Sequence, residues 1–311
     1  MLGALFPCQL RLCDRPHVED IFEQSYAIEP TENVTIRNGD GAVRVYGSTA
    51  TELSVHAIKR AYTPERLKQI VVNVSVRPGS VSIETTFPKK PTWGLFDRSG
   101  TVDYSVVVPQ TASISRLELD NGEVLVDGMH GQTMHARLGS GQMFEHNCFS
   151  DVVLSLGRGA LTLAYEWWGQ GRFSIRANIA RGNVWAFFPS DAAFHLIAKT
   201  VRGKIANDFA EQGGSAAKET SKVDALIHSG DEAAIQMHVR KAILKLGSKT
   251  RDAQKRGAFS RRSLGSCPVT QFAKSVWEFQ NQNGTAPPHF NVVTLLTLYR
   301  PTCPLSTSSP K

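Results

Sequence analysis

Short runs of alternating hydrophobic and polar residues dominate the chain from about residue 33 onward. Val34 and Ile36 alternate with polar neighbours, Val43 and Val45 follow in the same way, and the run from Leu53 to Ala57 continues the pattern. Period-two alternation separated by turn residues at roughly ten-residue intervals is typical of half-buried β-strands. The pattern therefore predicts an all-β fold.

A short phrase of glycine, a polar residue and an alternating strand recurs in the middle of the chain. It occurs as Asn121-Gly122-Glu123-Val124, Gly139-Ser140-Gly141-Gln142, Gly157-Arg158-Gly159-Ala160, Arg181-Gly182-Asn183-Val184 and Arg202-Gly203-Lys204-Ile205. The matching glycines, at 122, 141, 159, 182 and 203, lie 19, 18, 23 and 21 residues apart. A period near 20 with one turn and one short strand per unit predicts a stacked repeat over about residues 114–209, with glycine in the turns.

One helix interrupts the strand pattern. Thr63 is a helix-capping residue, and Pro64 suits the first helical position, where its missing N–H costs nothing. Leu67, Ile70 and Val71 then form an apolar stripe at helical spacing. We therefore expect a single short helix near residues 64–71.

Charge and pattern divide the chain into three parts. Residues 1–30 have no clear period and form an N-terminal lead segment, whereas residues 31–246 form the strand-rich domain. Residues 247–311 have no shared pattern and carry nine basic and two acidic residues, which accounts for the whole net charge of +7. The preceding part is balanced, with 26 basic and 26 acidic residues. We therefore expect a basic, poorly ordered tail and a domain with no overall attraction to nucleic acid.

Composition points to no membrane span and no cofactor. No apolar run reaches the length of a transmembrane helix, and the apolar start of the chain, residues 1–13, is a weak candidate for an export signal. The five cysteines include no CxxC pair, so neither a zinc site nor a disulfide framework is indicated.

Several segments together resemble a known family. They are an opening pair of strands with Asn-Gly, the short helix, the segment from Ser99 to Pro109, the Asn-Gly-x-Val units and the segment from Val201 to Phe209. Over about residues 30–246 the chain resembles the bacterial putative adhesin domain family, whose function is largely unknown. The resemblance implies a single-domain β-solenoid of short stacked strands, similar to a right-handed β-helix.

The same resemblance implies a location at the bacterial cell envelope or in the secreted fraction. The chain has no convincing export signal, so a cytoplasmic location stays open. The chain also departs from the family pattern, because Ser140, Arg181 and Arg202 precede glycines where asparagine is typical.

The densest aromatic cluster is the candidate binding surface. Tyr165, Trp167 and Trp168 flank the carboxylate of Glu166, and exposed aromatic rings beside a carboxylate can stack on sugars. The alternative is that some of these rings face the core and cover a neighbouring strand.

No residue pattern predicts a catalytic or metal site. His130, His135 and His146 are close enough in a stacked repeat for a metal pair to be conceivable, but solvated histidines are the simpler interpretation. The paired glycines lack the Lys-Ser/Thr and the helix of a phosphate loop. Ser150 and Asp151 are adjacent, as are Glu145 and His146, and adjacent strand residues point to opposite faces, so these pairs do not indicate a catalytic triad.

The sequence therefore favours a non-enzymatic structural or interaction module, adhesin-like, that presents a strand surface to a protein or polysaccharide partner. Two alternatives remain: a carbohydrate-binding or carbohydrate-active β-helix protein, and a cytoplasmic scaffold or regulatory module. A groove with three or more converging ionisable side chains would favour an enzyme.

Overall fold

The computed structural model describes residues 18–88, 100–169, 171–207, 209, 220–228, 230 and 232–249, which belong to one compact unit, Met1–Thr250. Within these residues it confirms an all-β fold with one short helix, α1 (Pro64–Lys68). The strands are β1 (Val18–Ala27), β2 (Asn33–Ser48), β3 (Glu52–Ala61), β4 (Val71–Arg77), β5 (Ser80–Thr86), β6 (Thr101–Pro109), β7 (Ser113–Asp127), β8 (Thr133–His146), β9 (Asp151–Ala164), β10 (Phe173–Pro189), β11 (Phe194–Asn207), β12 (Lys222–Ile227) and β13 (Ala233–Lys249).

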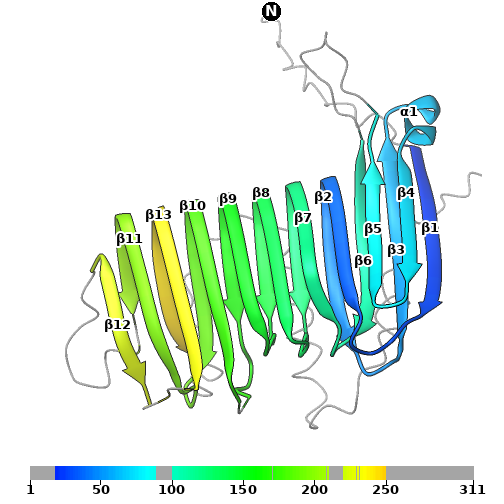
Figure 1. Cartoon of the computed structure of the whole chain (residues 1–311). Helices are drawn as coiled ribbons and strands as arrows, with labels where there is room; N and C mark the ends of the chain where they lie inside the picture. Colours follow the sequence, from blue (N-terminus) through cyan, green and yellow to red (C-terminus); the bar gives the residue numbers. More distant parts are fainter. Residues whose placement is uncertain are drawn as a thin grey trace, which may run out of the picture. The chain divides into compact units, whose positions relative to one another are not determined.

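The strands form one long sheet in the order β1-β3-β6-β2-β7-β8-β9-β10-β13-β11-β12 (Figure 1). From β6 to β11 every neighbouring pair is parallel, whereas β1, β3 and β6 at one end and β11 and β12 at the other pair antiparallel. The hairpin of β4 and β5 joins the sheet through a parallel pairing of β5 with β2. The parallel stack is thus the body of the fold, and antiparallel strands close its ends.

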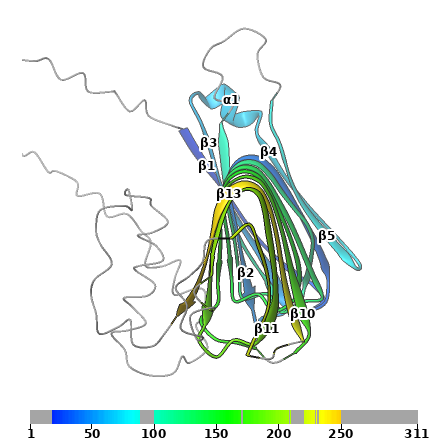
Figure 2. The same cartoon turned by 90° about the vertical axis from the view of Figure 1, so that its left-hand side faces the viewer.

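Each long strand of the stack consists of two arms joined by a bend, and the bends lie side by side (Figure 2). In β8 the first arm buries Met134, Ala136 and Leu138, and the second buries Met143 and Glu145. Alternation on both arms places the hydrophobic core between them. The prediction of a turn between strands at each repeat is therefore wrong, because the glycine bends a strand that continues on both sides.

The glycines of the repeated phrase form a ladder along the bends. Gly41, Gly122, Gly141, Gly159 and Gly182 are partners in successive strand pairs, and their φ angles lie between 126° and 144°. A Cβ on any of the last four would lie 1.7–1.8 Å from the carbonyl oxygen of the preceding glycine. Both the backbone angle and this close approach require glycine, which explains the repeated phrase.

The C-terminal strand enters the stack out of sequence order. β13 lies between β10 and β11 and pairs in parallel with both. Gly182 is opposite Ala242, which in turn is opposite Gly203, so the last two glycines of the predicted repeat are not neighbours. The prediction that consecutive repeats stack consecutively is therefore wrong at this step, because a fixed period gives the length of a strand but not its neighbours.

The strand β1 was not predicted, since no element was expected in residues 1–30. Its partly buried residues that pack on the core are Val18, Phe22 and Tyr26, four residues apart, and Ile21 is 61% exposed. As an edge strand covered on part of one face, β1 lacks the strict alternation by which strands are identified.

The helix begins where its sequence predicts but is shorter than residues 64–71, because it ends at Lys68 and Val71 already begins β4. The Thr63 hydroxyl accepts a hydrogen bond from the Arg66 amide at 3.2 Å, Pro64 begins the helix, and Leu67 and Ile70 are buried. β13 ends at Lys249, three residues past the predicted domain boundary at 246. The expected tail beyond it, the start of the lead segment and most of the expected loop at 87–100 lie outside the described residues.

Candidate functional site

The segments that follow β7, β8 and β9 gather the chemically richest residues of the stack. We call residues 127–133, 146–151 and 164–169 the loop edge. Backbone hydrogen bonds join its segments: the Phe149 amide donates to Met129 O at 2.9 Å, and the Asn147 amide donates to Ala164 O at 3.1 Å. The loop edge is therefore stacked in the same register as the strands that it connects.

The three aromatic residues predicted as a binding surface lie in different environments. Tyr165 is in the core, with 1% of its surface exposed, so it is not available to a surface ligand. Trp168 is partly buried, and its indole N–H donates to Ala193 O at 3.2 Å. Trp167 is 48% exposed, and its ring lies 4.3 Å from that of Phe149 between centroids. Only Trp167 is placed as a surface residue of this predicted group.

Trp168 belongs to a cluster of aromatic rings that fills the core near the loop edge. Its ring centroid lies 5.2–5.8 Å from those of four other rings, Tyr165, Phe173, Phe188 and Phe194. Aromatic pairs at these distances stabilise a fold beyond the area that they bury. Tyr165 and Trp168 therefore follow the alternative prediction, in which these rings face the core.

The buried carboxyl of Glu145 lies beside this cluster. Glu145 is 1% exposed and faces inward, with Val126 and Leu163 as its partners on the adjacent strands. Its Oε1 accepts a hydrogen bond from the Cys148 amide at 3.2 Å and lies 2.6 Å from Tyr165 Oη. Within the described residues, its Oε2 is buried without a hydrogen-bond partner. A carboxyl at a position that adjacent strands fill with Val and Leu is costly unless it is neutral.

Burial raises the pKa of Glu145 from 4.5 to about 7, although its hydrogen bonds to Tyr165 and Cys148 act in the opposite direction. The hydroxyl geometry agrees with a neutral carboxyl. Tyr165 Oη lies 2.7 Å from Cys148 O as well as 2.6 Å from Glu145 Oε1, and it has one hydrogen to donate. A protonated Glu145 donates to the tyrosine oxygen, which then donates to the carbonyl, so both contacts are satisfied.

The thiol and the phenol of this group are also held in their neutral forms. Burial and the nearby Glu145 raise the pKa of Cys148 and of Tyr165 well above their ordinary values. A buried neutral thiol is a poor nucleophile. Contacts from Glu145 through Tyr165 to Cys148 therefore join the end of β9 to the segment after β8 and stabilise the fold there.

The outer side of the loop edge carries a separate polar group. His146 Nδ1 lies 2.8 Å from Asp127 Oδ1, and His146 Nε2 lies 4.0 Å from Glu166 Oε1. Burial lowers the pKa of His146, but the hydrogen bond and negative charge of Asp127 outweigh it, so the net shift is upward. Glu145 and His146 lie on opposite faces of β8, as adjacent strand residues must.

The described residues contain no group of three or more His, Cys, Asp or Glu side chains placed to hold a metal ion. His130 contacts the rings of Phe149 and Trp167 edge-on, with centroids 5.6 and 6.0 Å away, and His146 is bound to Asp127. The two histidines considered as a metal pair thus have other partners here. Within the same residues, no helix is long and apolar enough to span a membrane.

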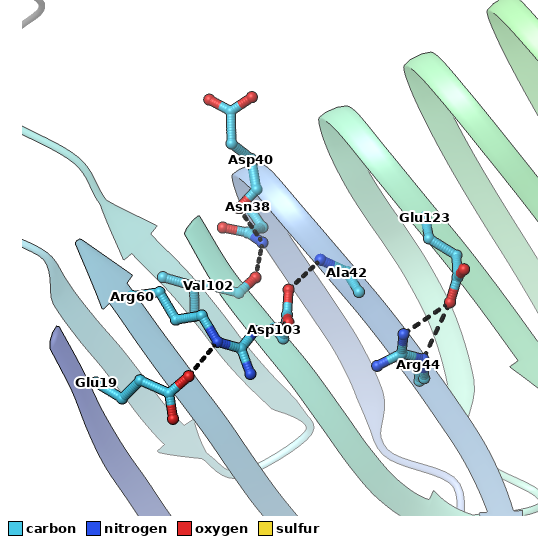
Figure 3. A network of polar contacts seen from close by, with 9 residues as sticks. All are labelled: Glu19, Asn38, Asp40, Ala42, Arg44, Arg60, Val102, Asp103 and Glu123. Atoms are coloured by element: carbon cyan, nitrogen blue, oxygen red, sulfur yellow. Dashed lines mark hydrogen bonds and ion pairs between the residues drawn. The ribbon is translucent and has the colours of Figure 1, made fainter. Parts of the chain in front are cut away.

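A second polar cluster connects the antiparallel end of the sheet to the parallel stack (Figure 3). Arg60 on β3 pairs with Glu19 on β1 at 2.6 Å and with Asp103 on β6. Asp103 Oδ1 also accepts a hydrogen bond from the Ala42 amide of β2 at 3.0 Å. Arg60 and Asp103 thus connect four strands, β1, β3, β6 and β2.

Replacing Asp103 is expected to test this connection. Asp103→Leu leaves the Ala42 amide, on a residue 5% exposed, without its acceptor, so the free energy of unfolding should fall by about 2 kcal/mol. Asp103→Asn keeps an acceptor oxygen and should cost less than about 1 kcal/mol. Urea unfolding followed by circular dichroism measures both, and equal losses would show that the amide contact contributes little.

Comparison with known proteins finds structural neighbours at low sequence identity. No protein-family model matches the chain, and no curated protein does. A putative cell adhesion protein from Clostridium sporogenes aligns over 74% of this chain and 100% of its own, with 10% identity and a TM-score of 0.46. A putative adhesin from Bacteroides fragilis aligns over 73% and 97%, with 11% identity and a TM-score of 0.27. A putative lipid binding protein from Parabacteroides distasonis aligns over 73% and 97%, with 12% identity and a TM-score of 0.28.

Two of these three neighbours are described as adhesion proteins. The sequence resemblance to the adhesin domain family therefore stays a prediction, since no family model matches the chain.

Proposed function

We propose that the domain is a non-enzymatic, adhesin-like interaction module of the bacterial cell envelope, built as a right-handed β-solenoid. The observation that carries the proposal is the parallel stack from β2 to β11, whose two arms enclose a continuous core and leave their outer faces to solvent. Connections between parallel strands are almost always right-handed, which supports the handedness. A stack of this kind presents side chains in rows at the spacing of the strands, about 4.8 Å.

Such rows suit a long partner better than a small molecule. Each outer position is repeated from one strand to the next, so a polymer or an extended protein surface can make the same contact several times. Many weak contacts along one line add to a useful affinity without a deep pocket. The sequence resemblance to the adhesin domain family supports a partner at the cell envelope.

One feature favours a carbohydrate-active protein as the second candidate. A depression of about 330 Å³ on the outer face of β7–β9 is lined by Arg116, Glu118, His135 and Arg137, among other residues. Glu118 lies 2.8 Å from Arg116, whose hydrogen bond holds the pKa of this carboxyl below its ordinary value. These four ionisable side chains meet the criterion that favours an enzyme. An ionised carboxylate can act as a base, but hydrolysis by paired carboxyls needs a second one, and Glu118 is the single carboxylate among the residues that line this depression. The interaction module therefore ranks first.

Turnover and binding assays separate the two candidates. The purified chain is expected to sediment with bacterial cell-wall preparations or insoluble polysaccharides without shortening the polymer or releasing new ends. Release of products that is lost in Glu118→Gln, with Glu52→Gln as an exposed control, would establish the enzyme instead. Fractionation of the source cells with an antibody checks the location, and recovery in the cytosol alone would overturn the envelope assignment.

A further inference from the structure

The residue before each ladder glycine changes character along the stack. In β2, β7 and β8 this position holds Asp40, Asn121 and Ser140. In the next four strands it is basic. We call those four residues the basic row: Arg158 in β9, Arg181 in β10, Lys241 in β13 and Arg202 in β11. Arg181 and Arg202 are the two arginines that precede glycines where asparagine is typical of the adhesin family.

The register places the basic row on consecutive strands. Arg158 is the partner of Arg181, and Lys241 is the partner of Arg202. Because Gly182 is the partner of Ala242, Lys241 also lies beside Arg181. All four residues are exposed at the bends, which lie side by side in Figure 2. Four cations from chain segments far apart in sequence are thus aligned on one ridge.

Within the described residues, none of these four side chains forms an ion pair, and no carboxylate lies in the adjoining sequence. The segments 155–161, 178–184, 199–206 and 238–245 contain neither Asp nor Glu. Elsewhere in the stack an arginine is paired: Arg44 lies 2.9 Å from Glu123 (Figure 3). Asp40, the acidic residue at the corresponding position of β2, is also paired, because its Oδ1 accepts a hydrogen bond from Asn121 Nδ2 at 3.0 Å.

Like charges directly opposite on adjacent strands destabilise a sheet. Neighbouring strands lie only about 4.8 Å apart, so adjacent cations of the row repel one another, and dissolved salt weakens the repulsion. The fold does not require cations at this position, because Asn121 and Ser140 occupy it in β7 and β8. An anion that lies along the basic row would relieve this repulsion.

We propose that the basic row binds a linear anionic polysaccharide with a carboxylate on every sugar. The chain would lie across the strands, with its axis along the stack. One strand spacing is close to the length of one pyranose residue, so successive carboxylates can meet successive cations. Arginine suits this task because its planar guanidinium binds a carboxylate through two hydrogen bonds.

The residues on either side of the row support a polysaccharide rather than a single-stranded nucleic acid. Small residues, Gly157, Ala160 and Ala180, flank Arg158 and Arg181, so a polymer can approach the backbone closely. Asn183 is exposed beside the row and offers an amide to hydroxyl groups. Single-strand binding relies on aromatic side chains on which bases stack, and none occupies the positions directly flanking the row.

Binding of the full chain to polygalacturonate tests the proposal. Calorimetry or biolayer interferometry should show binding that weakens as salt rises, and no binding of neutral dextran. The triple variant Arg158→Ser, Arg181→Ser, Arg202→Ser carries the residue found at position 140, so the fold should persist. Its affinity should fall at least tenfold. The control Lys68→Ser, Arg77→Ser, Arg172→Ser removes the same charge from α1, β4 and the segment before β10, and should bind within about twofold of the original chain.

Equal binding by the triple variant would overturn the proposal, since the basic residues past 246 would then account for the affinity. Single-stranded DNA that binds as tightly, and loses its affinity in the same variant, would overturn the choice of ligand. The proposal deepens the proposed function by naming the polymer. Its failure leaves that function standing, because turnover and cell fractionation test the function without polygalacturonate.

Discussion

Alanine in place of Gly141 is expected to unfold the domain or to lower its free energy of unfolding by more than about 4 kcal/mol. The Cβ would lie 1.8 Å from the carbonyl oxygen of Gly122, and the obstacle is backbone that is fixed in the ladder on both sides. Rotation of a side chain cannot relieve such a contact, so the strands must separate or the bend must open. Urea unfolding and the fraction of soluble protein measure the loss.

A matched glycine separates this contact from backbone strain. Gly171 has a φ of 138°, against 139° for Gly141, but a Cβ there would have no atom within 4 Å. Gly171→Ala therefore carries the cost of the backbone angle alone, about 1–2 kcal/mol. Similar losses for the two variants would contradict the close packing of the ladder, because the angle would then explain both.

The stability of the domain is expected to fall as the pH rises through the titration of Glu145. The folded pKa of about 7 lies above the ordinary 4.5, so the fold favours the protonated carboxyl. The contribution is fully present below about pH 4.5 and is lost as the pH rises to about 7. This rise in pKa corresponds to roughly 3 kcal/mol of unfolding free energy.

Glu145→Gln removes this titration but keeps an acceptor for the Cys148 amide and donors for the Tyr165 oxygen. The difference in unfolding free energy between Glu145→Gln and the original chain should therefore grow by about 3 kcal/mol from pH 4.5 to pH 8, in favour of the variant. Glu52→Gln, at an exposed position of β3, should follow the original chain at every pH. A difference that stays constant with pH would show that Glu145 is ionised in the fold.

The sequence predicts those parts of the fold in which the backbone conformation allows only certain residue types at a position. Gly122, Gly141 and Gly159 align as their spacing suggests, because any Cβ at these positions would meet the neighbouring strand. The Thr63 cap and Pro64 likewise begin a helix through local hydrogen bonds. β13 is recognisable as a strand from its alternation. Its bend holds Lys241 and Ala242, however, and without the glycine of the repeated phrase the sequence does not show that β13 belongs in the stack.

The candidate sites were harder to predict because exposure depends on tertiary neighbours. The aromatic pattern does not distinguish Tyr165, which is buried under other rings, from Trp167, which is exposed. A usable signal for Glu145 did exist. Aligning the repeats on their glycines places Glu145 in one column with Val126 and Leu163, which marks a carboxyl at an inward position.

The place of β13 affects the order in which the domain can be made on the ribosome. When β11 has been synthesised, its natural partner at that moment is β10, the preceding strand, and the glycines of both strands match. β13 follows only after residue 232, and it must then take the position between them. A nascent chain therefore cannot complete this end of the stack from its N-terminus onward. Its final assembly waits for release of the last strand, and the long sequence separation of these contacts slows that step.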